Sequence, residues 1–144
     1  MTSTAITAPL CRNYINGRWV ESRATQTLER RNPADLNEVV SVSPLSTRAE
    51  IGEAVAAAKA AFPAWRDTPA PTRGKILARA AALMEQRKEE LARTLTREEG
   101  KTFKESLVEM QRSINILEFT AGEGRRIGGE TVPSESPRNF NYTI

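Results

Sequence analysis

The chain has 144 residues and a formal net charge of +3, with 39% apolar and 27% charged residues. This composition is near the usual globular mix and excludes a disordered polyelectrolyte tail. The excess positive charge lies within residues 1–31, which carry five Arg and two Glu, while the remainder sums to zero. Because no basic face carries interleaved aromatic residues, we expect no nucleic-acid partner.

Histidine is absent and Cys11 is the only cysteine. These two facts exclude an internal disulfide, a Cys/His zinc site and a nucleophile activated by histidine. No apolar run approaches the ~20 residues of a membrane span, and the first residues lack the basic start and apolar stretch of a secretory signal. We therefore expect a cytoplasmic protein that has no membrane partner.

Short β-prone runs come first along the chain. Asn16-Gly17 offers the two residues that a type I′ turn favours, and it predicts a hairpin over residues 13–20. Residues 32–35, with the sequence Asn-Pro-Ala-Asp, are typical of a turn, and the valines of residues 39–42 predict a short strand that ends before the next proline. Residues 13–43 are therefore expected to be β-rich.

Helical patterns follow. Thr47-Arg48-Ala49-Glu50 is a capping box, and it begins a helix expected over residues 47–61, because Pro63 disfavours helix at the residue before it. A second pattern covers residues 70–99, between a proline-rich start and a C-terminal glycine. Its length predicts a break near Arg87-Lys88.

A second capping box, Thr102-Phe103-Lys104-Glu105, begins a helix expected over residues 102–123. Its apolar residues recur at intervals of four and three, which predicts one continuous stripe. The stripe consists of Phe103, Leu107, Met110, Ile114, Leu117 and Ala121. Further on, Phe140, Tyr142 and Ile144 alternate as on one face of a strand. Three amphipathic helices beside so few strands predict an incomplete α/β domain.

Two features look like active-site motifs but have simpler interpretations. The glycines of residues 122–128 follow a helix and not a strand, and Ile127 stands where a dinucleotide motif has its third glycine. We therefore interpret this segment as a helix end. Cys11 has no local feature that would activate its thiol, so we do not expect it to act as a nucleophile.

Charged residues on the helices leave two interpretations open. Glu98 and Glu99 lie at a helix end, where the helix dipole disfavours negative charge. They are either part of a charge-balanced, solvated surface or a functional pair. Arg112 lies beside the apolar stripe and is either a plain surface arginine or a binding residue.

Five segments occur in a characteristic order and spacing. They are Asn13-Tyr14-Ile15-Asn16-Gly17-Arg18-Trp19, Asn32-Pro33-Ala34, the run from Ala54 to Phe62-Pro63-Ala64-Trp65, Glu98-Glu99-Gly100-Lys101 with the later Ala121-Gly122, and Gly129-Glu130-Thr131-Val132-Pro133. Together they resemble the N-terminal part of NAD(P)-dependent aldehyde dehydrogenases. The resemblance extends over about residues 12–144.

The resemblance implies the α/β fold of that family, of which this chain would form the N-terminal part. A β-hairpin and short strands would be followed by three amphipathic helices and a truncated hairpin strand, in an incomplete Rossmann-like domain. Residues 1–12 would be a flexible tail, residues 13–127 part of the dinucleotide-binding domain, and residues 128–144 the start of the oligomerisation hairpin.

The resemblance also implies a reaction, in which an aldehyde, NAD(P)+ and water give a carboxylate and NAD(P)H. Complete members of the family are homodimers or homotetramers. The family's nucleophilic cysteine, general-base glutamate, oxyanion asparagine and nucleotide-binding glycines all lie downstream of Ile144. The chain is therefore expected to hold no catalytic or cofactor-binding residue, and to bind neither NAD nor NADP and remain inactive by itself.

Two residue roles are carried over from the resemblance. Glu98 and the backbone carbonyl of Arg31 match positions that bind a structural monovalent cation in some members. Arg112 matches the helix that borders the substrate tunnel, where a guanidinium would pair with the carboxylate of an acidic semialdehyde. Residues 111–125 are similar to members that act on ketoglutaric semialdehyde.

A stand-alone helical interaction module without catalysis is the alternative. As part of a larger enzyme, the chain would expose the apolar stripe and would aggregate or stay molten. A module would unfold cooperatively by itself.

Overall fold

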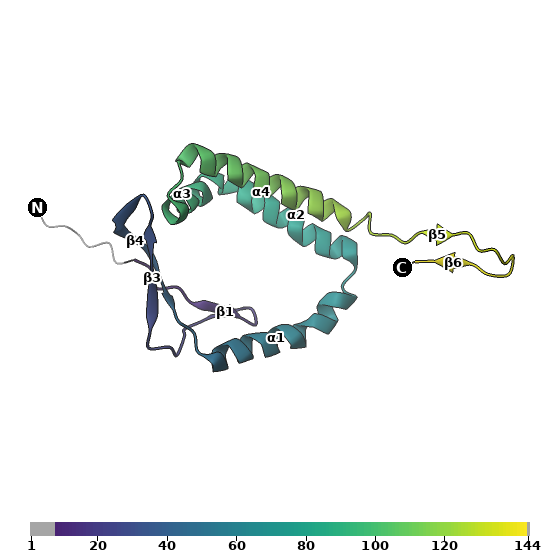
Figure 1. Cartoon of the computed structure of the whole chain (residues 1–144), viewed down its shortest axis with the longest axis horizontal. Helices are drawn as coiled ribbons and strands as arrows, with labels where there is room; N and C mark the ends of the chain where they lie inside the picture. Colours follow the sequence, from purple (N-terminus) through teal and green to yellow (C-terminus); the bar gives the residue numbers. More distant parts are fainter. Residues whose placement is uncertain (1–7, 144) are drawn as a thin grey trace, which may run out of the picture.

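A computed structural model describes residues 8–143 (Figure 1). Its elements, in chain order, are β1 (Asn13–Ile15), β2 (Arg18–Val20), β3 (Thr27–Asn32), β4 (Asp35–Pro44), α1 (Arg48–Asp67), α2 (Ala70–Gln86), α3 (Lys88–Glu99), α4 (Phe103–Glu123), β5 (Thr131–Val132) and β6 (Asn141–Tyr142). The strands form three antiparallel pairs, β1–β2, β3–β4 and β5–β6. The predicted α/β class and the β-rich start are confirmed.

The β1–β2 hairpin is the one that Asn16-Gly17 predicts. Both residues have positive φ angles, 51° and 75°, as a type I′ turn requires. Tyr14 and Trp19 face each other across the ladder, and their ring centroids lie 5.0 Å apart. The turn and the aromatic pair thus set the register together.

Strand β3 was not predicted, because its sequence Thr-Leu-Glu-Arg-Arg-Asn is mostly polar on both faces and lies largely at the surface. It pairs with β4, which is longer than the valines alone indicate and includes Pro44. The predicted turn joins the two strands, and the Ala34 amide donates to Asn32 Oδ1 at 2.9 Å. A mostly exposed polar strand carries little periodic signal of its own.

The N-terminal segment pairs with β4. The Cys11 amide donates to the Val42 carbonyl at 2.8 Å, and the Val42 amide donates to the Pro9 carbonyl at 3.0 Å. Residues 1–7 of the predicted tail lie outside the described residues. The division at residues 12 and 127 stays a prediction.

Helix α1 extends beyond its predicted end at residue 61. It passes through Pro63 and ends only at Asp67, so that prediction was wrong. Pro63 has no backbone N–H, so the carbonyl of Lys59, four residues earlier, loses its helical hydrogen bond. Lys59 is exposed, and water can bind that carbonyl instead. Thr68 then ends the helix by donating its hydroxyl to the Ala64 carbonyl at 2.8 Å.

The long helical pattern breaks where predicted. Helix α2 ends at Gln86 and α3 begins at Lys88, with Arg87 between them in a non-helical conformation. Both capping boxes are present, each with a threonine hydroxyl accepting from the third amide of its helix. The β5–β6 hairpin extends away from the helices (Figure 1), and its predicted strand residue Ile144 lies outside the described residues.

The apolar stripe of α4 packs against α2 and α3, so the expected exposure of Phe103, Leu107, Met110, Ile114 and Leu117 is wrong. Ile114 is 2% exposed, and Ala81 of α2 and Ala92 of α3 are buried as well. Ser106 and Thr96 share a hydrogen bond of 2.8 Å beneath this contact. The three helices thus cover the stripe within the chain itself.

Two glycines, one in α2 and one at the C-cap of α4, let these helices approach each other closely. A Cβ atom added to Gly74 would lie 2.4 Å from the Ala121 carbonyl oxygen, and one added to Gly124 would lie 2.6 Å from the Ala70 carbonyl oxygen. Real Cβ atoms do not come so near to backbone oxygens. Only glycine therefore permits this crossing.

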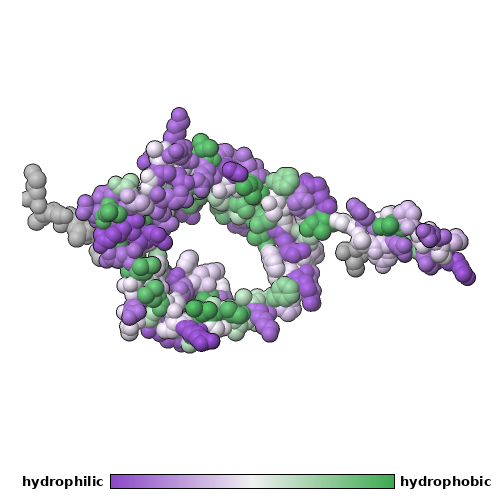
Figure 2. Space-filling model, in the orientation of Figure 1, coloured by the Kyte–Doolittle hydropathy of each residue, from purple (hydrophilic) through white to green (hydrophobic). Residues whose placement is uncertain are grey.

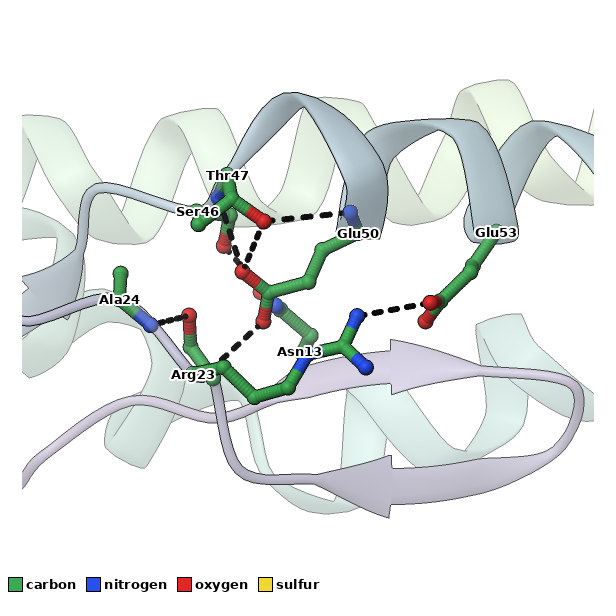
Figure 3. A network of polar contacts seen from close by, with 8 residues as sticks. Asn13, Arg23, Ala24, Ser46, Thr47, Glu50 and Glu53 are labelled. Carbon is green, nitrogen blue, oxygen red and sulfur yellow. Dashed lines mark hydrogen bonds and ion pairs between the residues drawn. The ribbon is translucent and has the colours of Figure 1, made fainter.

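Helix α1 is held mainly by one polar network (Figure 3). The amide and hydroxyl of Thr47 each donate to Glu50 Oε2 at 2.8 Å, and the Arg23 amide donates to Glu50 Oε1 at 2.9 Å. The Arg23 guanidinium also pairs with Glu53 at 2.7 Å. The capping box thereby ties the segment after β2 to the start of α1.

Donors around Glu50 change its acidity. The Thr47 amide, the Arg23 amide and the Thr47 hydroxyl stabilise the carboxylate and lower the pKa of Glu50 from 4.5 to about 2. The residue is only 5% exposed. These donors therefore favour the ionised form of Glu50.

Much apolar surface remains uncovered. The chain exposes 11,848 Å², whereas a compact monomer of its 15.9 kDa mass exposes about 7,300 Å². Figure 2 shows an opening between α1 and the α2–α4 pair, bordered in part by apolar surface. The exposed apolar side chains of the helices include Ile51, Val55 and Phe62 of α1 and Val108, Ile116 and Phe119 of α4.

The glycine crossing is tested by Gly74→Ala. We expect this substitution to lower the free energy of unfolding by about 1–3 kcal/mol, because the added methyl group forces α2 and α4 apart. Gly52→Ala is the matched control: its Cβ would meet nothing within 4 Å, so it is expected to stabilise α1 by about 0.5–1 kcal/mol. Urea unfolding followed by helical circular dichroism measures both, and equal effects of the two substitutions would contradict the crossing.

The Glu50 network is tested by the pH dependence of stability. Because folding lowers the pKa of Glu50, its contribution is fully present above pH 4.5 and is lost as the pH falls toward 2. Glu50→Gln should be less stable at neutral pH and should lose less stability between pH 4.5 and 2. Glu53→Gln removes the ion pair with Arg23 but keeps the three donors to Glu50, so it should keep the acid-dependent loss. Identical acid profiles for Glu50→Gln and the unsubstituted chain would contradict this assignment.

Candidate functional site

The end of α3 lies against the turn between β3 and β4. Gly100 ends the helix in the left-handed conformation, with a φ angle of 77°. A Cβ atom placed on it would lie 3.1 Å from both the Ala34 amide nitrogen and the Pro33 Cβ. The structure therefore brings the neighbourhoods of Glu98 and Arg31 together.

A charged pair reinforces this contact. Arg97 Nε donates to Glu38 Oε1 at 2.6 Å, and Asn32 Nδ2 donates to Glu38 Oε2 at 2.7 Å. The hydrogen bond from Asn32, followed by the one from Arg97, lowers the pKa of Glu38. Glu38 thus links the β3–β4 hairpin to α3 through both of its carboxylate oxygens.

Glu98 and Arg31 themselves are exposed. The ladder register shifts on both sides of Arg31, and such a bulge disrupts regular backbone pairing at that residue. The Arg31 guanidinium donates to the Leu36 carbonyl at 2.9 Å and pairs with Glu29. Within residues 8–143 no group of three or more His, Cys, Asp or Glu side chains could hold a metal ion. A cation here would depend on one carboxylate and on backbone carbonyls.

Arg112 lies on the outer face of α4, in an open hollow of about 630 Å³. The hollow is lined by Glu105, Val108, Glu109, Arg112, Ser113 and Ile116. Both acids have other partners, since Glu109 pairs with Lys101 and Glu105 belongs to the capping box with Thr102. Among residues 8–143, Arg112 forms no ion pair. Its guanidinium is therefore available to an anion.

The remaining sequence candidates behave as helix-end and surface residues. Cys11 is exposed. Helix α4 ends at Glu123 with Gly124 as its cap, and the Ile127 amide donates to the Glu123 carbonyl at 3.0 Å. The Arg126 guanidinium lies 3.0 Å from the position that a Cβ on Gly122 would take. These glycines therefore end a helix and do not lead from a strand into one, as a dinucleotide loop does.

A second hollow, which sequence reasoning missed, lies where α1, α2 and α4 meet. It has a volume of about 250 Å³ and contains Trp65 and Arg73. The Arg73 guanidinium carbon lies 6.0 Å from the centroid of the Trp65 ring. The chain has many arginines, so no local pattern could have singled out this one.

In the part of the chain that the structure describes, no helix is both long enough and apolar enough to cross a membrane.

Comparison with known proteins identifies relatives. Malonate-semialdehyde dehydrogenase 1 of Geobacillus thermodenitrificans (strain NG80-2) is 46% identical over 85% of this chain and 25% of its own length. The α-ketoglutaric semialdehyde dehydrogenase of Bacillus subtilis (strain 168) is 44% identical over 91% of this chain and 27% of its own length. A crystal structure of an NAD-dependent benzaldehyde dehydrogenase from Corynebacterium glutamicum superimposes with a TM-score of 0.79 at 33% identity, covering 91% of this chain and 28% of that one.

The chain thus spans about a quarter of the length of the relatives it matches. Residues 19–144 match the aldehyde dehydrogenase family. The order of short strands and helices also agrees with the corresponding part of the solved structure. On this evidence the chain belongs to the aldehyde dehydrogenase family.

Proposed function

We propose that the chain serves as the N-terminal part of an NAD(P)-dependent aldehyde dehydrogenase. In the proposed reaction an aldehyde, NAD(P)+ and water give a carboxylate and NAD(P)H. The family match over residues 19–144 is the observation that carries this proposal. The matched parts of the two semialdehyde dehydrogenases named above are 46% and 44% identical to this chain.

The described residues do not fit the binding of the cofactor. NAD or NADP would accept the hydride, but the glycines after α4 end a helix and Arg126 covers Gly122. We therefore assign this chain a role in the scaffold and the substrate channel, with the cofactor and the chemistry supplied by the rest of such an enzyme.

The proposed substrate is a semialdehyde that carries a carboxylate. Two of the similar proteins named above are dehydrogenases of malonate semialdehyde and of α-ketoglutaric semialdehyde. Arg112 has a guanidinium without an ion-pair partner in the described region, and the exposed apolar side chains of Val108 and Ile116 lie beside it. A planar guanidinium binds a carboxylate through two parallel hydrogen bonds. Arg112 would then orient the substrate by its acid end.

A monovalent cation between α3 and β3 is a further part of the proposal. Oxygen ligands suit a hard cation, and the Glu98 carboxylate with the Arg31 carbonyl would supply two of them. The approach of Gly100 to Pro33 and Ala34 supports this pairing of elements. Such a cation would also offset the negative end of the α3 dipole.

The β5–β6 hairpin is proposed to contribute to a dimer or tetramer of the complete enzyme. It stands apart from the helices (Figure 1), and Phe140 and Tyr142 are exposed on it with ring centroids 5.9 Å apart. An isolated two-stranded hairpin is marginally stable in water. A subunit interface would cover it. The cytoplasmic location of that enzyme remains part of the same proposal.

The proposed function is tested in a chimera. Residues 19–143 replace the matching segment of the Bacillus subtilis relative, and the purified chimera is assayed with acidic semialdehydes and with neutral aldehydes of similar length. We expect NAD(P)+-dependent oxidation of the acidic substrates. A folded chimera that oxidises no aldehyde would contradict the proposed function.

In the same chimera, Arg112→Gln tests substrate selection. Losing a charge-assisted, two-point contact should lower kcat/KM for acidic semialdehydes by about tenfold or more. The value for neutral aldehydes should not change. Arg125→Gln, which removes a cation outside the hollow, should leave both values unchanged. An equal loss for acidic and neutral aldehydes in Arg112→Gln would overturn the assignment of Arg112.

The cation role is tested on the 144-residue chain by thermal unfolding. Sodium or potassium should stabilise it by about 1 kcal/mol, relative to a bulky organic cation at equal ionic strength, once the ion is at several times its Kd. Glu98→Gln should abolish that gain, whereas Glu85→Gln should retain it. A gain that is unchanged in Glu98→Gln would remove Glu98 from the proposal.

A further inference from the structure

The hollow between α1, α2 and α4 has the chemistry of an anion site. It is formed by the last turn of α1, the first two turns of α2 and the end of α4. Its walls are mostly apolar and include Trp65, Leu77 and Ile127, with Arg73 and Glu123 as the charged residues. The glycine crossing of α2 and α4 forms one side, so the hollow is fixed by the same contact that holds the two helices together.

Arg73 is an unsatisfied cation in this wall. Its Nε atom is buried, and in the described part of the chain it has no hydrogen-bond partner. The guanidinium lies over the Trp65 ring, with its central carbon 6.0 Å from the ring centroid, and this contact supplies no hydrogen-bond acceptor. Because Nε is closed to solvent, an added acceptor would bind the two terminal nitrogens, which form no hydrogen bond within residues 8–143 and are not buried. An anion there would offset the cost of a partly buried charge that has no counter-ion.

Glu123, the acidic residue in the wall, does not neutralise the charge of Arg73. Glu123 accepts from Arg126 Nε at 2.9 Å and pairs with the terminal nitrogen of the same arginine. The charge of Glu123 is thus balanced by Arg126, and Arg73 keeps an uncompensated positive charge. The hollow therefore combines an apolar wall, a flat aromatic ring and one free guanidinium.

We propose that this hollow binds a small carboxylate ion through Arg73. A carboxylate is planar and offers two oxygens, which match the two terminal nitrogens of the guanidinium. The short carbon chain of such an ion would contact Trp65, Leu77 and Ile127, and a volume of about 250 Å³ limits it to a few carbon atoms. The site lies at the opposite end of α4 from Glu105, which lines the Arg112 hollow, and it does not depend on the proposed enzymatic function.

Fluorescence of Trp65 in the full 144-residue chain tests the proposal. Trp19→Phe leaves Trp65 as the single tryptophan. Sodium acetate and sodium malonate are titrated against sodium chloride at equal ionic strength. We expect a saturable change in Trp65 emission with the carboxylates that chloride does not produce.

Three variants in that background identify the binding group. Arg73→Gln removes the charge, and Arg73→Lys keeps the charge but loses the planar fork, so each should weaken carboxylate binding by about tenfold or more. Arg79→Gln removes an exposed arginine of the same helix and should bind as the parent does. Circular dichroism checks that each variant is folded. If Arg73→Gln does not fold, Arg73→Lys alone tests the role of the guanidinium.

Several outcomes would overturn the proposal. The first is a response to acetate or malonate that equals the response to chloride. The second is an Arg73→Lys variant that binds carboxylates as tightly as Arg79→Gln does. The third is phosphate binding as tight as carboxylate binding. The last result would show that the hollow accepts anions in general and does not select a carboxylate.

Discussion

The close approach of α2 and α4 at Gly74 and Gly124 is the contact on which the helical part of the molecule depends. It allows Ile114 to be buried, and α3 then closes over the other end of the same stripe. It also fixes one wall of the hollow that contains Arg73. A side chain at either glycine would separate the helices, so packing and the proposed anion site share one steric requirement.

Helix α1 depends on a different kind of interaction. It makes few contacts with other helices, and the Glu50 carboxylate with its donors from Thr47 and Arg23 holds its first turn. Beyond that turn its apolar residues face solvent. Relatives of this chain are about four times as long as the part that matches it. Apolar faces of this extent are what a larger dehydrogenase of the family would cover.

Local chemistry explains which parts of the fold could be predicted from the sequence. The type I′ turn at Asn16-Gly17, both capping boxes and the break at Arg87 each depend on a few neighbouring residues. Strand β3 and the continuation of α1 through Pro63 do not, because one needs β4 as a partner and the other needs a solvated carbonyl. Periodicity showed which face of α4 is apolar, but it could not show that α2 and α3 cover that face. Arg112 was found through the family resemblance, whereas Arg73 gains its meaning only where three helices meet.

Amide hydrogen exchange of the 144-residue chain tests this account most directly. If the glycine crossing carries the stability, amides of α2 and α4 on both sides of Gly74 and Ala121 should exchange most slowly. Amides of α1 after Glu53 and of the β5–β6 hairpin should exchange much faster. Protection of α1 equal to that of α2 would contradict the account, because it would show that α1 is stabilised by more than its first turn.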